Sequence, residues 1–320
     1  MSLSIILQQM GVICILVAIG FYLQKKDVID ALTSKKLSAI VVDVCNPAMI
    51  MASILSGNVT ATHQDLLTAI VLGAGFYALL IILGFLLPRI LRVAPEKRRH
   101  YNLMTVYTNT GFLGIPVAKA ILPANAIIYV IVINVFYTLL FYTHGVTVLG
   151  GGKEGPSSKG GSAAFLSGLR RIISPGTLMS VLSLVVFWYH VTPPPILKNS
   201  IEYVGNATVF LSMTLLGVSI ARSRLMESIK DIRIWAYVGL RMILVPVGIV
   251  FLMRLLHFDP VATLAMCLMA AVPVGNLPMI QAEKIGEDTK TFSSAIAVTT
   301  AVSIGTITIL ISIFTGILAP

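Results

Sequence analysis

Long apolar stretches alternate with short polar ones along the whole chain of 320 residues. A bilayer core about 30 Å thick needs roughly 20 apolar residues per spanning helix, and stretches of that length recur throughout. The pattern predicts an all-α integral membrane protein with ten transmembrane helices. The predicted helices lie at residues 4–24, 37–56, 66–88, 102–122, 126–149, 176–192, 201–221, 235–256, 261–282 and 291–317.

Composition agrees with this pattern, because 57% of the residues are hydrophobic, only 11% are charged, and the mean hydropathy is +0.92. Ten helices and short connections leave no room for a soluble domain. The first apolar stretch has no basic region before it and no small-residue cleavage pattern, which favours a retained helix over a signal peptide. Cys14, Cys45 and Cys267 all fall in apolar stretches. Their odd number and placement predict neither disulfides nor a metal site, and no cofactor is expected.

The basic residues predict the orientation of the helices. Nineteen of the 23 lysines and arginines fall in alternate connections, which the positive-inside rule assigns to the cytoplasm. We therefore expect a multi-pass protein of the plasma membrane, in bacteria the inner membrane, with both termini outside. The net charge of +10 is then a topology signal and predicts no nucleic-acid partner.

The chain divides into two halves around a stretch rich in Gly and Ser. Residues 1–149 and 176–320 each hold five predicted helices, and residues 150–175 are predicted to form a flexible cytoplasmic linker. Because five is an odd number of spans, the second half should be inverted relative to the first. The sequence thus predicts two inverted five-helix repeats in the lipid bilayer.

The fourth and ninth predicted helices share a motif in which Gly precedes Pro inside the span. They read NTGFLGIPVAKAI over 109–121 and PVGNLPMIQAEKI over 273–285. Proline lacks an amide hydrogen and glycine weakens a helix, so we expect interruptions at Pro116 and Pro278, 162 residues apart. Backbone freed in mid-membrane must line a cavity or meet a ligand, and half-helix N-termini there attract anions. Kinks that only improve helix packing are the alternative.

Two signatures carry a resemblance to a known family: Asn109-Thr110 followed by Gly114-Ile115-Pro116 and Lys119-Ala120, and Val272-Pro273-Val274-Gly275 with Pro278. They resemble those of the auxin efflux carrier family, which includes plant PIN-type carriers and shorter bacterial relatives. The chain lacks the long hydrophilic loop of the plant carriers and is similar to the compact bacterial type.

The resemblance implies a secondary transporter with a scaffold of helices one, two, six and seven and a mobile unit of the other six. It implies small carboxylates as substrates, either auxin-like or dicarboxylates such as malonate or malate, and a possible homodimer. By matching to the family signatures, Asn109 contacts substrate and Pro116 lies at the helix crossing. Gly275 and Pro278 are carried over in the same way.

Other polar residues join the predicted substrate site on chemical grounds. Asn276 and Asn46 carry amides that can donate to a carboxylate without the cost of burying a charge. Thr110 and Gly114 belong to the same motif as Asn109. Hydrogen bonding between helices is the alternative role for the buried asparagines.

Asp43 is the only acidic residue near the middle of a predicted span. It is the candidate for ion coupling, as a proton carrier or a cation ligand, and it shares a helix face with Asn46. A structural pairing with Arg241 is the alternative. Arg241 and Lys119 are possible partners for a substrate carboxylate, although either could instead reach the membrane interface.

Rival functions are weaker in the sequence. No HExxH, GxSxG or cluster of His with carboxylates is present, so an enzyme is not expected. A receptor lacks a soluble output domain. A sodium- or proton-coupled cation antiporter, or a bile-acid-type symporter of related fold, is the serious alternative. The sequence and the resemblance together predict an organic-anion carrier with an elevator mechanism, with a proton or sodium ion as a possible coupling partner.

Overall fold

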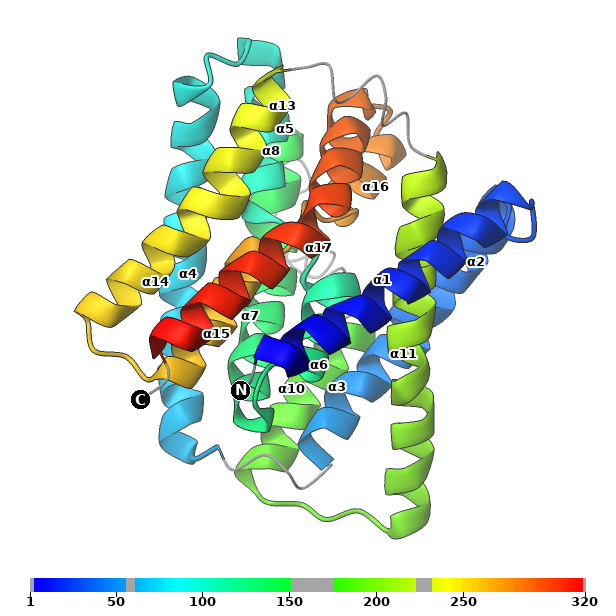
Figure 1. Ribbon diagram of the computed structural model, residues 1–320, viewed down its shortest axis with the longest axis vertical. Coiled ribbons are helices and arrows are strands. Elements are labelled where there is room, and N and C mark those ends of the chain that lie inside the picture. Colours follow the sequence, from blue (N-terminus) through cyan, green and yellow to red (C-terminus); the bar gives the residue numbers. More distant parts are fainter. Residues whose placement is uncertain (1–2, 56–60, 151–174, 223–231, 319–320) are drawn as a thin grey trace, which may run out of the picture.

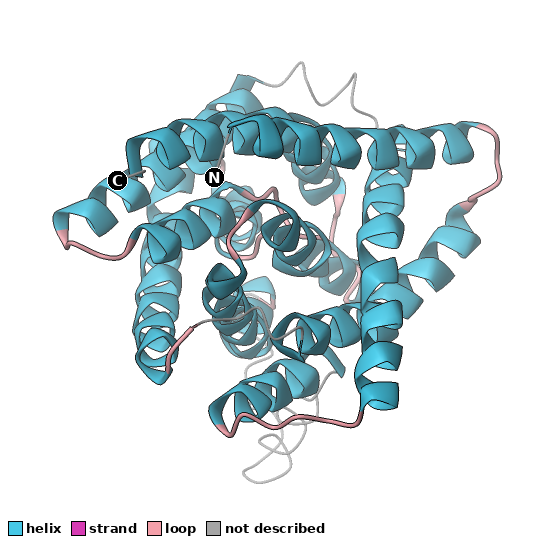
Figure 2. Cartoon of the chain, turned by 60° about the horizontal axis from the view of Figure 1, so that its bottom comes forward, coloured by secondary structure: helices cyan, strands magenta, loops and turns pink. Residues whose placement is uncertain are grey.

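The computed structural model describes residues 3–55, 61–150, 175–222 and 232–318. Within these ranges the chain is helical, with short connections and no β-strand (Figure 2). The linker predicted at 150–175 lies outside the described residues except for its first and last positions. Helices occupy all ten of the predicted apolar stretches.

Five helices run without a break or a change of helix type: α1 (Leu3–Lys25), α4 (His63–Ile90), α10 (Pro175–Trp188), α11 (Pro195–Arg222) and α17 (Lys290–Leu318). Three longer segments each contain a π-helical stretch of five or six residues. The first comprises α2 (Ala31–Ile40), η1 (Val41–Cys45) and α3 (Asn46–Leu55), and the second comprises α7 (Ile127–Leu140), η4 (Phe141–Gly145) and α8 (Val146–Leu149), preceded by η3 (Ala124–Ala126). The third comprises α13 (Ile232–Val238), η6 (Gly239–Leu244) and α14 (Val245–Leu255). Such π-helical stretches shift the phase of a helix and are frequent at functional sites.

Two predicted helices are split into halves. The first comprises α5 (Pro95–Val106), then η2 (Thr110–Gly114) and α6 (Ile115–Ile121). The second comprises α15 (Pro260–Ala271) and α16 (Leu277–Lys284). The interruptions fall at residues 107–109 and 272–276, so both predicted breaks exist. Their positions differ from the prediction, because each break precedes its proline.

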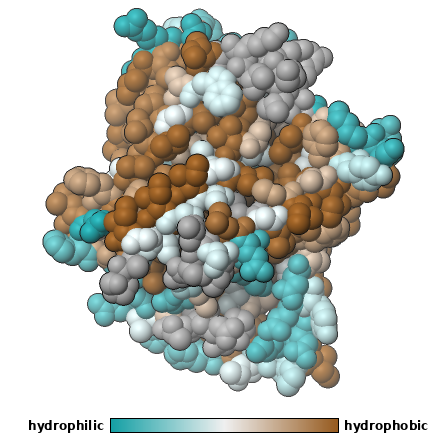
Figure 3. Space-filling model, in the orientation of Figure 1, coloured by the Kyte–Doolittle hydropathy of each residue, from teal (hydrophilic) through white to brown (hydrophobic). Residues whose placement is uncertain are grey.

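Seven helical segments of the described chain are long and apolar enough to cross a membrane, and α10 and α15 are shorter apolar helices. Many large apolar side chains on these segments are exposed, as expected where lipid replaces water. Figure 3 shows hydrophobic residues over most of one face, with hydrophilic residues gathered toward its edges. The chain is therefore a membrane protein with several spans, as the sequence predicts.

The helices pack most extensively in two groups. In the first group α11 packs along α1 and α3, and α3 also packs on α10. In the second group α4 packs on α5 and α7, and α15 packs on α14 and α17. Figure 1 shows α1 and α11 crossing on one side of the molecule and α4 and α14 on the other. The groups also contact each other, through α17 on α1 and α7 on α10, and their assignment to a scaffold and a mobile unit stays a prediction.

Glycines let α1 and α11 meet backbone to backbone. A Cβ at Gly20 would lie 1.9 Å from the carbonyl oxygen of Thr214, and one at Gly217 would lie 1.9 Å from that of Val17. Small residues allow this close approach between helices in a membrane, where van der Waals packing holds helices together. The first group is thereby built around a closely packed pair of helices.

Both chain termini lie in the lower half of Figure 1, whereas the C-terminal ends of α1 and α11 lie at the upper side. Lys25 and Arg222 belong to these upper helix ends. The predicted placement of the termini outside the cell stays a prediction. The assignment of the upper side to the cytoplasm stays a prediction.

Candidate functional site

The two broken helices cross at their interruptions and hydrogen bond to each other there. The Asn109 amide donates to the Pro273 carbonyl at 2.8 Å, and the Gly275 amide donates to the Tyr107 carbonyl at 3.1 Å. Thr108 thus pairs with Val274 as an antiparallel bridge, the only such bridge in the described chain. Backbone groups freed from the helices therefore satisfy one another instead of remaining unpaired in the membrane.

Gly275 is required for this approach. A Cβ at that position would lie 2.9 Å from the carbonyl oxygen of Thr108 and 3.0 Å from that of Tyr107. Both oxygens belong to the backbone of residues 107–108 on the other broken helix and cannot rotate away as a side chain could. The predicted site residue Gly275 therefore acts through its missing side chain, which permits the crossing.

The crossing corrects the relation between the two prolines. Thr108 pairs with Val274, an offset of 166 residues, whereas Pro116 and Pro278 are 162 apart. The π-helical η2 lies between the crossing and Pro116 but has no counterpart before Pro278. Both prolines are buried. Pro278 lies in the first turn of its half-helix, where its missing amide costs no hydrogen bond, whereas Pro116 lies at the start of α6, directly after η2.

Asn109 and Asn276 stand at the starts of the two second halves. The carbonyl of Asn109 accepts from the Gly114 amide at 3.0 Å, and that of Asn276 accepts from the Ile280 amide at 3.0 Å. Both residues line one cavity of about 490 Å³. The two asparagines that the sequence singled out from different halves of the chain are thus brought together.

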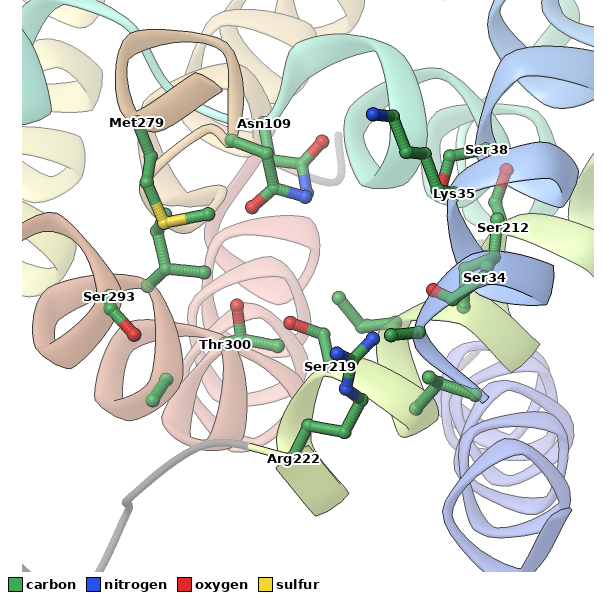
Figure 4. Close-up of a pocket in the computed structure, with 17 residues that line it drawn as sticks. Ser34, Lys35, Ser38, Asn109, Ser212, Ser219, Arg222, Met279, Ser293 and Thr300 are labelled. Carbon is green, nitrogen blue, oxygen red and sulfur yellow. The ribbon is translucent and has the colours of Figure 1, made fainter. Parts of the chain in front are cut away.

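The cavity lies between the crossing and two helices of the first group. Its walls are α2, α11, α17 and the start of α16, and Figure 4 shows how their side chains surround it. The polar residues that line it are Ser34, Lys35, Ser38, Asn109, Ser212, Ser219, Arg222, Asn276, Ser293 and Thr300. Met279 and several aliphatic side chains supply the apolar part of the wall. An amphipathic organic molecule fits such a surface.

The charged residues of the cavity wall are both cations. Lys35 extends from α2 and Arg222 from the last turn of α11, and among the described lining residues none is acidic. Asp30 caps the start of α2 by accepting from the Thr33 amide at 2.7 Å, which fixes the helix that presents Lys35. This hydrogen bond lowers the pKa of Asp30 below its usual value. The described lining of the cavity therefore carries two exposed positive charges, and Asp30 is close enough to Arg222 for their charges to interact. We call the part of the cavity at Lys35 and Arg222 its mouth.

The other residues of the Asn109 motif face away from the cavity. Thr110 is buried, and its hydroxyl donates to the Asn134 side chain at 3.3 Å, which in turn donates to Ser180 of α10 at 3.4 Å. Gly114 is also buried, and a Cβ there would lie 3.2 Å from the Met269 side chain. Thr110 thus connects the crossing with α10, and Gly114 makes room for its neighbours.

Asn46 and Asp43 lie in different surroundings. The Asn46 amide nitrogen is 3.0 Å from the place that a Cβ of Gly111 would occupy, so Asn46 lies against η2 beside the crossing. Asp43 lies in the π-helical η1, is exposed, and is not among the cavity residues. The structure therefore places Asn46, but not Asp43, next to the candidate site.

Arg241 and Lys119 do not line the cavity either. Arg241 is 1% exposed, and its guanidinium donates to the backbone carbonyls of Thr105 and Ala270. Lys119 donates to the side chain of Asn206 in α11 at 3.3 Å. Neither side chain is placed to bind substrate directly.

Sequence reasoning missed Lys35, Arg222 and the cavity serines as site residues. Lys35 and Arg222 were assigned to topology because they lie near helix ends. A signal was present, since Ser34 and Ser38 share one face of α2, and Ser212 and Ser219 share one face of α11. Hydroxyls repeated at helical spacing beside a terminal cation could have indicated a polar cavity wall.

Comparisons with known proteins agree with these features. A family model described as membrane transport protein matches residues 5–311. An uncharacterized transporter of Methanocaldococcus jannaschii is 25% identical over 307 residues, covering 92% of this chain and 94% of the relative. An uncharacterized transporter of Methanothermobacter thermautotrophicus is 23% identical over 292 residues, covering 91% of this chain and 93% of the relative.

We predict that Gly275→Ala disrupts the crossing. The added Cβ would press on two backbone carbonyls, and overpacking of this kind costs roughly 1–3 kcal/mol. The midpoint of thermal unfolding in detergent should fall clearly below that of the wild type. Gly248→Ala in α14 is the matched control, because a Cβ there meets nothing within 4 Å. Equal midpoints for the two variants would show that the crossing does not depend on Gly275.

Proposed function

Because the chain belongs to the membrane transport protein family, which includes the auxin efflux carriers, we propose that it is a secondary transporter of small organic anions. The observation that carries this proposal is the cavity at the crossing. Its wall combines two cations, two amides and several hydroxyls with an apolar part. A carboxylate on a small carbon skeleton matches that combination.

In this proposal Asn109 and Asn276 bind the carboxylate. Their amides can donate hydrogen bonds without holding a permanent charge in the membrane. Each stands just before the N-terminal end of a half-helix, where the partial positive charge of the helix favours an anion. Asn46 supports the site from the scaffold side, while Gly275, Pro116 and Pro278 shape its backbone.

Transport would proceed by an elevator movement of the second helix group against the first. We interpret the ten helical stretches as two inverted five-helix repeats, with the crossing carried by the moving group. Among the described residues, three hydrogen bonds of side chains join the groups: Lys119 to Asn206, Asn134 to Ser180, and His63 to the Trp188 carbonyl. All three would have to break during the movement, so they hold the observed state.

The cavity favours this function over a cation antiporter. A cation-binding cavity needs carboxylate or carbonyl oxygens to replace the water around the ion. The described lining of this cavity has two positive side chains and no carboxylate. A bile-acid-type symporter would need a far larger apolar wall for its substrate.

Uptake by reconstituted vesicles tests the function directly. A panel of labelled mono- and dicarboxylates is offered under an imposed pH or sodium gradient, and at least one acid should accumulate. Asn109→Ala should reduce that uptake at least tenfold, since a lost hydrogen bond to a charged group costs about 1.5–3 kcal/mol. Cation flux driven by the gradients, with no uptake of any acid, would contradict the proposal.

Replacing both mouth cations should weaken substrate capture. In Lys35→Gln with Arg222→Gln, we expect KM to rise about three- to tenfold at low salt, because the attraction of the anion to the mouth is lost. The difference from the wild type should shrink at high salt, where screening removes the attraction in both proteins. Arg254→Gln, at an exposed position outside the cavity, is the control. A salt-independent defect, or none, would argue against this role.

Asp43 is our proposed coupling residue, as the single acidic side chain near the middle of a predicted span. Because Asp43 does not line the cavity, its protonation would act through the helix that also carries Asn46. Asp43→Asn should flatten the dependence of uptake on pH while leaving uptake at the optimum largely intact. A pH profile identical to that of the wild type would remove Asp43 from the mechanism.

A further inference from the structure

Arg241 is a buried arginine whose charge is not matched by a carboxylate. It lies in η6 and is 1% exposed. None of the ion pairs between described residues includes it, and the polar side chains close enough to act on it are Tyr77 and Tyr237. An isolated charge in such a place is costly, so its hydrogen-bond partners should explain its presence.

Those partners are the ends of two half-helices. The Nε atom donates to the Thr105 carbonyl at 2.9 Å, and a terminal nitrogen donates to the Ala270 carbonyl. Thr105 lies in the last turn of α5 and Ala270 in the last turn of α15. One guanidinium therefore joins the two first halves of the broken helices.

Both carbonyls lack their usual helical donor. In an unbroken helix Thr105 would accept from the Asn109 amide, but that amide donates to Pro273 across the crossing. Ala270 would accept from the Val274 amide, which donates to the Thr299 hydroxyl at 3.2 Å. Arg241 donates to both carbonyls in place of the amides that the helix breaks direct elsewhere. It does so at the C-terminal ends of two half-helices, which carry partial negative charge.

We propose that Arg241 is a positioning residue that makes the crossing selective for anions. Its charge offsets the negative ends of α5 and α15, so the positive N-terminal ends at Asn109 and Asn276 act on the cavity unopposed. The inference rests on the proposed transport of anions, which it deepens by naming the source of charge selectivity. Arg241 acts through the two half-helices and does not touch substrate.

The positions of the two carbonyls suit arginine, and this single side chain contacts both broken helices. A planar guanidinium can reach two carbonyls at fixed angles, whereas an ammonium is a single point donor.

The test measures electrostatic potential at the crossing without any substrate. In a background where Cys14, Cys45 and Cys267 are replaced by Ser, Asn276→Cys places one thiol on the cavity wall. Its rates of modification by an anionic and a cationic methanethiosulfonate, ethylsulfonate and ethyltrimethylammonium, are compared by mass spectrometry. The ratio of the two rates reports the sign of the local potential.

With Arg241 present, the anionic reagent should be favoured at the Asn276→Cys thiol relative to a thiol from Ser200→Cys, an exposed position on α11. Arg241→Gln should lower the ratio at least about fivefold, since a buried charge is screened less than one in water. Arg241→Lys should keep it within about twofold, because the charge is retained. The ratio at the Ser200→Cys thiol should not change in either variant.

An unchanged ratio in folded Arg241→Gln would overturn the proposal, and so would an equal fall in Arg241→Lys, which would make hydrogen-bond geometry the cause. Size-exclusion chromatography decides which variants are folded, and Arg241→Met is the second neutral replacement. If neither neutral variant folds, the Asn276→Cys and Ser200→Cys thiols are compared in Lys35→Gln with Arg222→Gln, which removes the cations of the cavity wall. A remaining anionic preference at the Asn276→Cys thiol then supports the proposal, and its absence overturns it. Uptake assays can fail while the ratio shifts, so this test is separate from that of the proposed function.

Discussion

The pair of hydrogen bonds between residues 107–109 and 273–275 is the constraint on which the rest of the structure depends. A membrane offers no water to free backbone groups, so two helices can break in it only if they satisfy each other. The pairing sets the position of Asn109 and Asn276, demands glycine at 275, and withdraws amides from Thr105 and Ala270. The candidate substrate cavity and the hydrogen bonds of the buried Arg241 both follow from this one contact.

Charge is distributed around the crossing in a consistent way. Lys35 and Arg222 stand at the mouth of the cavity, and the fully buried Arg241 holds the ends of the two first half-helices. The exposed cations can attract an anion from water, and the helix ends with their asparagines can hold it. Cations at both depths, with no acidic side chain in the described cavity wall, give an arrangement suited to moving a negatively charged molecule through lipid.

Much of the fold could be predicted from the sequence, because the bilayer requires apolar stretches of known length and breaks leave Gly and Pro behind. The pairing offset could not, because nothing in a single sequence marks the π-helical η2 that separates Pro116 from the crossing. Asn109 and Asn276 were found from chemistry and motif. Lys35 and Arg222 were missed because a basic residue at a helix end has the same signature whether it sets topology or lines a cavity. Asp43 was predicted to share a face with Asn46, but η1 changes the helical phase between them.

The central claim is that an organic anion binds at the crossing between the two asparagines. A structure determined with a bromine-substituted carboxylate that competes with a transported acid tests it most directly, because anomalous scattering locates bromine without ambiguity. The account predicts a bromine peak inside the cavity lined by Asn109 and Asn276, with the carboxylate within hydrogen-bonding distance of both amides. Bromine bound elsewhere, with the cavity free of it at saturating concentration, would contradict the account.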